Sequence, residues 1–271
     1  MKSPSFRFSL RSSLRSSFRF SLRPYERYER IGRGYAEQRR TDPRIASAIR
    51  GAIGDAATVL DIGSGTGNYE PVGCQVIALE PSATMIEQRP PTGAPCVRGI
   101  AEQLPFANAS FDATLTVLSV HHWNDPAAGL AEMVRVSERQ VVFYFESAFT
   151  DEAWIMEYWP EIVGLPTERD PPGEALFRQH LDVREIIAIP VPRDCSDGFA
   201  GAYWARPECY LDGSVRRAMS CFAQLGRGAV ERGSDRLRRD LRSGAWDARH
   251  GYLRDLTERD LGYRLLVAGR R

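Results

Sequence analysis

A glycine-dense loop between two apolar runs, within residues 58–80, constrains the fold of this chain more than any other feature. The run 59–62 predicts a buried strand, three glycines follow at alternate positions, and a second apolar run ends on Glu80. Glycine is required where the backbone approaches a ligand closely or adopts a positive φ. Open α/β sheets bind ligands at the carboxyl ends of their strands, where a terminal carboxylate can accept hydrogen bonds from a ribose diol. The segment therefore predicts a binding site for a nucleoside cofactor.

The spacing of the three glycines, Gly63, Gly65 and Gly67, argues against two common nucleotide sites. A dinucleotide fingerprint requires its third glycine at the position that Asn68 occupies, and a P-loop requires a lysine that this loop lacks. Asp61, at the end of the first predicted strand, would repel a pyrophosphate but could accept a hydrogen bond from a cationic amino group. The loop therefore suits a cofactor with an amino group better than a dinucleotide.

Strands and helices alternate through the first two thirds of the chain. Apolar runs at 96–98, 113–118 and 140–145 predict further strands, and the Asp-Pro pairs at 42–43 and 125–126 predict helix starts. This alternation is typical of an α/β fold with a doubly wound, mostly parallel sheet.

The last third of the chain has a different pattern. Two further strands, at 185–191 and 262–268, bring the expected sheet to seven strands. The sequence between them is mostly helical in pattern and predicts a helical lid at about 192–259. One helix face in this lid is expected to contain Val215, Met219, Phe222 and Leu225.

The connection between the first two strands is short. Eight positions separate Gly67 from Val76, and they include Pro71 and Gly73. A parallel crossover that contains a helix requires ~10–12 residues or more. We therefore expect this first helix to be a single turn or absent, and Tyr69 becomes a candidate wall of the cofactor site.

Four motifs occur in order between residues 59 and 123: V-L-D-I-G-S-G-T-G, L-E-P-S, G-I-A-E-Q-L-P-F and F-D-A-T-L-T-V-L-S-V-H-H-W. With them the chain resembles class I S-adenosylmethionine-dependent methyltransferases of the type 11 group and is similar to quinone-biosynthesis C-methyltransferases. The resemblance implies a Rossmann-like methyltransferase domain over residues 25–271, with S-adenosyl-L-methionine as its cofactor.

The resemblance also implies roles for individual residues. Asp61 and the glycine loop would hold the methionine part of the cofactor, and Glu80 would hold the ribose hydroxyls. Met85 would flank the adenine, although an ordinary core methionine is an alternative. Ile100 stands where related sequences often have an acid, which leaves side-chain recognition of the adenine amine open. The expected cofactor contacts are Asp61, Gly63, Ser64, Gly65, Gly67, Tyr69, Glu80, Pro81, Met85, Ala101, Glu102 and Ser119.

The pair His121 and His122 follows the fourth predicted strand at the cofactor end of the sheet. Because a histidine there could titrate near neutral pH, the pair is the candidate general base. Two alternatives stay open: one histidine packs structurally, or the reaction needs no base. Trp154, Tyr158 and the lid aromatics either line an apolar substrate pocket or form the core of the lid.

Composition bounds what else the chain could do. The net charge of +1 gives the whole molecule no bias toward nucleic acid or membranes. The five scattered cysteines contain no C-x-x-C pair, so we expect no disulfide framework and no metal site, and a reducing, cytoplasmic location. No apolar run is long enough to span a membrane.

The first 24 residues are a segment of their own, with six basic residues, no acidic residue and the sequence S-F-R-F-S-L-R twice. We interpret them as a disordered low-complexity tail; a surface-binding or targeting helix is the alternative. Tyr25, Tyr28 and Tyr35 then predict a short helix or cover segment before the sheet.

The sequence predicts a methyltransferase that acts on a small, partly apolar organic molecule, with no nucleic acid partner. An RNA methyltransferase that uses the basic tail is an alternative, although the chain has L-S-V-H-H-W where amine-methylating relatives have [D/N]-P-P-[Y/F]. A non-catalytic S-adenosylmethionine-binding protein is another, against which Asp61 and Glu80 argue. The methyl acceptor, the atom methylated and the oligomeric state stay open.

Overall fold

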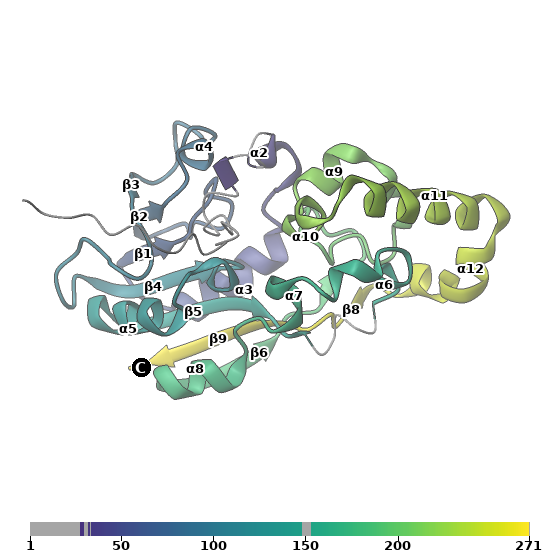
Figure 1. Cartoon of the computed structure of the whole chain (residues 1–271). Coiled ribbons are helices and arrows are strands. Elements are labelled where there is room, and N and C mark those ends of the chain that lie inside the picture. The colour runs from purple at the N-terminus through teal and green to yellow at the C-terminus, as the bar shows by residue number, and fades with distance from the viewer. Residues whose placement is uncertain (1–27, 30–31, 33, 148–152, 271) are drawn as a thin grey trace, which may run out of the picture.

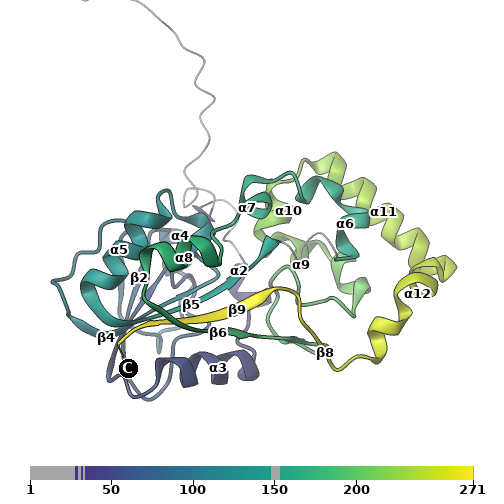
Figure 2. The same ribbon diagram turned by 90° about the horizontal axis from the view of Figure 1, so that it is seen from below.

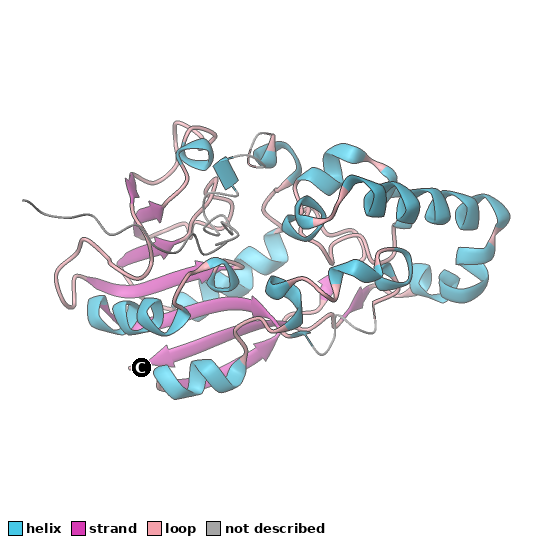
Figure 3. Cartoon of the chain, viewed as in Figure 1, coloured by secondary structure: helices cyan, strands magenta, loops and turns pink. Residues whose placement is uncertain are grey.

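Seven strands form one sheet in the computed structural model, which describes residues 28–29, 32, 34–147 and 153–270 (Figures 1 and 3). The strands are β1 (Thr58–Ile62), β2 (Gln75–Glu80), β3 (Cys96–Arg98), β4 (Phe111–Val117), β5 (Ser137–Phe145), β6 (Val183–Ala188) and β9 (Tyr263–Gly269). Their order is β3-β2-β1-β4-β5-β9-β6. The first five are parallel, and β9 is antiparallel to both of its neighbours. The predicted seven-stranded, mostly parallel sheet is confirmed.

Helices cover both faces of this sheet (Figure 2). Helix α3 (Pro43–Ile53) lies on one face, and α5 (Pro126–Val136) and α8 (Glu174–His180) lie on the other. Both predicted Asp-Pro starts are confirmed: Asp42 accepts a hydrogen bond from the backbone N–H of Arg44, and Asp125 accepts one from Ala128. The short helix α2 (Tyr35–Gln38) precedes α3, and the short helix α4 (Ala83–Ile86) follows β2.

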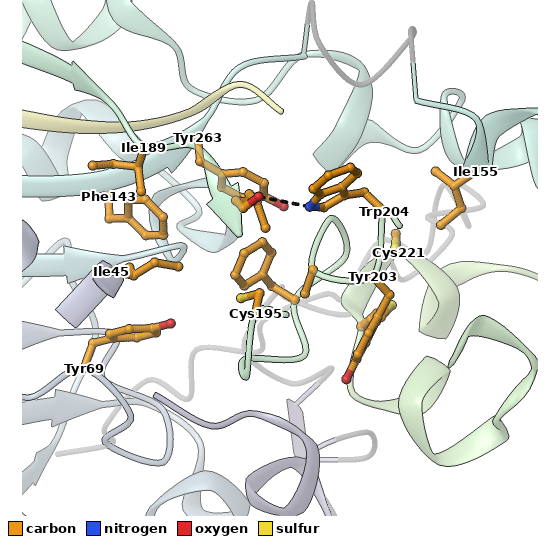
Figure 4. Packing of buried hydrophobic residues seen from close by; sticks show 14 of the residues in the cluster. Ile45, Tyr69, Phe143, Ile155, Ile189, Cys195, Tyr203, Trp204, Cys221 and Tyr263 are labelled. Carbon is orange, nitrogen blue, oxygen red and sulfur yellow. Dashed lines mark hydrogen bonds between the residues drawn. The ribbon is translucent and has the colours of Figure 1, made fainter. Parts of the chain in front are cut away.

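The central strands are buried on both faces, which explains their continuous apolar sequence. In β5, Val141 and Phe143 pack on the α3 side, whereas Val142 and Tyr144 pack on the side of α5 and α8. Full burial of one such side chain stabilises the fold by ~1.5–3 kcal/mol. The α3-side core continues without interruption into the lid, as Figure 4 shows for residues from Ile45 to Trp204.

The crossover from β1 to β2 contains no helix, as the short spacing predicted. An ion pair between Glu70 and Arg89 holds this loop instead. Arg89 also donates to the hydroxyl of Ser64 and the carbonyl of Gly65, and the other oxygen of Glu70 accepts from the backbone N–H of Ala94. The loop is therefore fixed without the helix that a longer crossover would supply.

The lid has two parts that are distant in sequence. The part between β6 and β9 was predicted, and its helices are α9 (Gly213–Arg217), α10 (Ser220–Gln224), α11 (Arg227–Ser243) and α12 (Ala245–His250), with 3-10 turns at Pro207–Leu211 and Gly251–Asp255. A second part follows β5 and contains α6 (Ile155–Tyr158), α7 (Pro166–Arg169) and the 3-10 turn Pro160–Ile162. It packs against the first part, which the sequence pattern did not predict (Figure 1).

Aromatic side chains join the two parts of the lid. Trp154 stacks edge-on against Trp246 at 5.4 Å between ring centroids, and Trp159 does so against Phe222 at 4.9 Å. The indole N–H of Trp159 donates to the carbonyl of Val230 on α11 at 3.2 Å. The lid thus has its own aromatic core.

Two predicted elements have different bounds. The expected helix face from Val215 to Leu225 is divided between α9 and α10, because the backbone at Met219 is extended. The strand expected at 185–191 ends at Ala188, since Pro190 has no N–H for the ladder. The next residues form β7 (Val191–Pro192), which pairs with β8 (Glu258–Arg259) in a separate short ladder.

The predicted tail, residues 1–24, lies outside the described residues. Within the part of the chain that is described, no helix is long and apolar enough to cross a membrane.

Candidate functional site

The loop after β1 forms a cradle at the carboxyl end of the sheet. Gly63 and Gly65 have φ values of 69° and 55°, a region that side chains strongly disfavour. A Cβ on Gly63 would lie 1.9 Å from the hydroxyl oxygen of Ser119, which follows β4. The backbone of this loop therefore lies directly against the end of the neighbouring strand, and only glycine permits that approach.

Asp61 lies at the base of this cradle with 3% of its surface exposed. Among the described residues, its Oδ1 atom has no hydrogen-bond partner. Burial raises the pKa of Asp61 to about 8, and the nearby carboxylates of Glu70 and Glu80 add to this effect. A buried carboxylate without a partner is costly, so this position is suited to a ligand that carries a positive charge.

Glu80 connects the end of β2 to the cradle. Its two carboxylate oxygens accept hydrogen bonds of 2.9 Å from the backbone N–H groups of Gly65 and Ser82. Burial raises the pKa of Glu80, while these two hydrogen bonds lower it. Each carboxylate oxygen has a second lone pair, so Glu80 can hold the loop in place and still accept hydrogen bonds from a ligand.

These residues line a first cavity with an empty volume of about 840 Å³, open solvent at its mouth included. Most of the predicted cofactor contacts line it, namely Asp61, Gly63, Ser64, Gly65, Tyr69, Glu80, Pro81, Met85, Ala101 and Ser119. Gly67 and Glu102 do not line it. A Cβ on Gly67 would lie against Glu70 and Arg89, and the carboxylate of Glu102 accepts hydrogen bonds from the backbone of Asn124 and Asp125.

The segment before the sheet covers this cavity. Tyr28, Tyr35 and Arg39 all line it, and none of them was predicted as a site residue. The clustered tyrosines gave the signal of a cover segment, but nothing in the pattern distinguished Arg39 from the many other arginines.

A hydrogen-bond network joins the first cavity to the lid. The hydroxyl of Tyr69 donates to Asp197 at 3.1 Å and accepts from the backbone N–H of Asp42 at 3.3 Å. The backbone N–H of Ser196 donates to the carboxylate of Asp42 at 3.1 Å. Tyr69 therefore lines the cavity and also contacts the lid, while its predicted contact with the cofactor stays a prediction.

A second cavity lies beside the first, with an empty volume of about 910 Å³, open solvent included. Its walls are mostly apolar and come from the sheet end and both parts of the lid, for example Phe145, Ile155, Phe199, Met219 and Leu261. The two cavities share the residues Tyr28, Tyr35, Arg39, Leu118 and His122. His121 lines the second cavity alone. A molecule in either cavity would thus contact the same wall.

His122 ends the 3-10 turn Val120–His122 that follows β4. Its Nε2 atom lies 2.8 Å from the hydroxyl oxygen of Tyr28, and the two rings meet edge-on with centroids 5.2 Å apart. The ring of His121 lies 3.8 Å from that of His122. The histidine pair is therefore at the junction of the two cavities.

Several other candidates lie outside both cavities. Trp154 and Tyr158 line neither of them. The indole N–H of Trp154 donates to the carbonyl of Trp204, and the hydroxyl of Tyr158 donates to the carboxylate of Asp240, both within the lid. Cys195 also lines neither cavity. Burial raises the pKa of its thiol to about 12, so the thiol stays protonated and is a packing group, not a nucleophile. No cluster of three or more metal-ligating side chains occurs among the residues that the structure describes.

Comparison with known proteins points to one family. The methyltransferase domain family matches residues 60–145. A solved structure from Anabaena variabilis, of a protein assigned as a methyltransferase from an antibiotic biosynthesis pathway, is 31% identical. The similarity covers 86% of this chain and 99% of that protein, with a TM-score of 0.80.

Curated relatives match over shorter lengths. Demethylmenaquinone methyltransferase of Renibacterium salmoninarum is 37% identical over 86 residues, which is 30% of this chain and 36% of that protein. Malonyl-[acyl-carrier protein] O-methyltransferase of Erwinia billingiae is 34% identical over 133 residues, 45% of this chain and 53% of that protein. The chain thus spans about a third to a half of the length of these curated relatives.

Proposed function

Because this chain belongs to the class I S-adenosylmethionine-dependent methyltransferase family, we propose that it transfers the methyl group of S-adenosyl-L-methionine to a small organic molecule. The observation that carries this proposal is the buried Asp61 carboxylate, whose Oδ1 atom has no partner among the residues described. The cofactor has an α-amino group whose positive charge fits this position. An ion pair there would offset the burial that raises the pKa of Asp61.

The other walls of the first cavity fit the remaining parts of this cofactor. Glu80 retains lone pairs for the ribose hydroxyls, and Pro81 and Met85 provide an apolar surface for the adenine ring. Arg39 is the candidate partner of the cofactor's carboxylate. It lies in the wall of the same cavity, and beyond its ion pair with Asp197 its guanidinium has further N–H groups to donate. Ser119 lies beside Gly63, where we expect the methyl-bearing sulfur.

When bound, the cofactor supplies an already activated methyl group. The task of the protein is then to orient the acceptor, exclude water and accept a proton where one is released. Alignment of two reactants can lower a barrier by ~7–11 kcal/mol. The second cavity is the proposed acceptor site, because it shares a wall with the first and is mostly apolar.

His122 is the proposed proton acceptor. It lines both cavities, and its imidazole is of the type that titrates near neutral pH. His121 contacts His122 and lines the acceptor side, so its proposed role is to position that ring.

The lid supports a small acceptor over a nucleic acid. Both parts of the lid contribute walls to the second cavity, and a base within an RNA strand would have to pass between them. The cytoplasmic location and the division at residue 25 stay predictions.

Calorimetry with S-adenosylmethionine and with its demethylated product, S-adenosylhomocysteine, tests the proposal. We expect Asp61→Asn and Glu80→Gln each to weaken binding of S-adenosylmethionine by about 10-fold or more, since each loses a charge-assisted hydrogen bond. Asp235→Asn, on the exposed surface of α11, is the matched control and should bind as the wild type does. Absence of binding to the wild type, or equal binding by all four proteins, would refute the cofactor assignment.

A further inference from the structure

The contact between Tyr28 and His122 lies between the two cavities, where a proton released by a methyl acceptor could be taken up. Both residues line both cavities, and the Tyr28 hydroxyl oxygen lies 2.8 Å from Nε2 of His122. A phenol hydroxyl at this distance can donate to the imidazole while its oxygen accepts from another hydroxyl group. A molecule in the second cavity can therefore reach the imidazole through the tyrosine.

The cofactor's positive sulfonium would disfavour a cationic acceptor beside this pair. Arg39 lies in the same shared wall, but its charge is already paired with Asp197. Amines are protonated at neutral pH, so an amine would have to enter this wall as a cation or lose its proton first. A neutral molecule with an acidic hydroxyl meets no such repulsion, and the sulfonium of the cofactor would stabilise its anion.

Among the other titratable groups around the pair, Glu168 is the competing proton acceptor, because its carboxylate lines the second cavity, and Glu168→Gln is the variant that tests it. Asp61 and Glu80 lie in the wall of the first cavity only, and Glu168 lies in the wall of the second cavity only. Burial raises the pKa of Tyr263 and of Cys221, so neither takes part near neutral pH. The titratable or charged groups that line one or both cavities are Tyr28, Tyr35, Arg39, Asp61, Tyr69, Glu80, His121, His122, Glu168, Cys221 and Tyr263.

We propose that Tyr28 is a catalytic residue that relays the acceptor's proton to His122, and that the acceptor is an apolar molecule bearing an ionisable phenol or enol hydroxyl. This inference rests on the proposed methyltransferase function and names its acceptor class. The second cavity provides the apolar binding surface, through side chains such as Phe145 and Met219.

The proposed step balances without any further reactant. The acceptor hydroxyl gives its proton to the Tyr28 oxygen, as the Tyr28 hydroxyl gives its own proton to Nε2 of His122. The acceptor oxygen then forms a bond to the methyl carbon while the bond from that carbon to sulfur breaks, and the sulfur keeps the electron pair. The products are a methyl ether, neutral S-adenosylhomocysteine and a protonated His122, which later releases its proton to water.

A chromophoric phenol tests the relay directly. 4-Nitrophenol changes its absorption spectrum when it ionises, so its protonation state can be followed while it is bound. The measurement uses the full chain with S-adenosylhomocysteine present, so that no methyl transfer occurs. We expect the bound phenol to ionise at a lower pH than it does in solution. Tyr28→Phe and His122→Gln should each reduce the ionised fraction by about tenfold at a given pH, which corresponds to one pKa unit.

Tyr252→Phe is the matched control, because this exposed tyrosine lies in neither cavity, and it should behave as the wild type does. 4-Nitrobenzylamine, a cation of similar shape, should bind at least tenfold more weakly than 4-nitrophenol. A second readout is the pH dependence of 4-nitroanisole formation with S-adenosylmethionine, whose acid limb should be lost in Tyr28→Phe.

The proposal is overturned if 4-nitrophenol does not bind, if it binds without a change in its ionisation, or if the amine binds better. It is overturned equally if Tyr28→Phe leaves both the bound phenolate and the acid limb unchanged. Cofactor calorimetry on each variant separates these results from a failure of the proposed function, because a variant that binds S-adenosylhomocysteine normally has an intact first cavity. If Tyr28→Phe does not fold, Tyr28→Leu, which also lacks the hydroxyl, provides the same measurement.

Discussion

Arg39 and Asp197 form a two-pronged ion pair across 158 residues of sequence. Nε of Arg39 donates to Oδ1 of Asp197 at 2.6 Å, and Nη2 donates to Oδ2 at 3.1 Å. The side chain of Asp197 is fully buried and that of Arg39 is 11% exposed. Because Arg39 lines both cavities and Asp197 lies at the base of the lid, this pair fixes the lid against the site.

We expect Asp197→Ala to lower the free energy of unfolding by about 3–5 kcal/mol, since it leaves the guanidinium of Arg39 buried without its partner. Urea denaturation measures this loss. The matched control is Glu231→Ala, which removes the partner of Arg227 in an exposed pair on α11 and should cost less than about 1 kcal/mol. Equal losses in the two variants would contradict a structural role for the buried pair.

A comparison of Gly63→Ala with Gly244→Ala distinguishes the cost of backbone strain from the cost of a steric clash. Both glycines have a positive φ, 69° and 77°, so each alanine should cost ~1–2 kcal/mol for its backbone conformation. Only Gly63 has a neighbour in the way, the hydroxyl of Ser119 at 1.9 Å from the added Cβ, whereas Gly244 has none within 4 Å. We therefore expect Gly63→Ala to lower the midpoint of urea denaturation further and to weaken cofactor binding.

The double variant Gly63→Ala with Ser119→Gly checks the cause of that larger loss. Removal of the Ser119 side chain should restore part of the lost stability, so that the two changes are not additive. Strict additivity would show that the loss comes from the backbone alone.

The contribution of Asp61 to the stability of the apo protein should fall as the pH rises from about 4 to about 8. Burial raises the pKa of Asp61 to about 8 in the folded state, from 3.8 as its ordinary value. Between these values the folded state holds more of this carboxyl's proton than the unfolded state does, so the contribution of Asp61 to the free energy of unfolding falls with increasing pH. Thermal denaturation at several pH values should show that wild-type stability falls relative to that of Asp61→Asn over this range, and the difference should level off below pH 4. An equal pH dependence in the two proteins would contradict a raised pKa of Asp61.

Filling the second cavity should stop methyl transfer without affecting cofactor binding. Ala200 lines this cavity and not the first one, so Ala200→Trp should exclude the acceptor but leave the affinity for S-adenosylmethionine within about twofold. Ala248→Trp, on the exposed surface of α12, is the control. Labelled methyl transfer from S-adenosylmethionine into a small-molecule extract, with calorimetry alongside, measures both effects. Transfer by Ala200→Trp at the wild-type rate would place the acceptor elsewhere.

Local patterns in the sequence predicted the local parts of the fold. The N-caps at Asp42 and Asp125 depend on neighbouring backbone, and the absence of a helix after Gly67 follows from chain length alone. The cofactor cradle is similarly local, because the loop and Glu80 belong to consecutive segments. Its predicted roles in cofactor binding stay predictions that calorimetry can test.

Contacts between distant segments could not be predicted in this way. Tyr28 contacts His122, and Arg39 contacts Asp197, only because the fold brings these segments together. No pattern of residue spacing in the sequence predicts either contact. The second part of the lid was missed for the same reason: Trp159 looks like an ordinary core residue until its partner Val230 is known. The break at Met219 was missed because helical periodicity continues across it.

The division of the lid into two segments limits how this protein could be re-engineered. An exchange of residues 193–257 alone would replace Trp246 and Phe222, the ring partners of Trp154 and Trp159. An exchange of the α6–α7 segment alone would replace Trp159, which packs so closely on Gly233 that a Cβ there would lie 2.2 Å from its indole nitrogen. A chimera with a new acceptor specificity therefore requires both segments from the same donor protein, transplanted together.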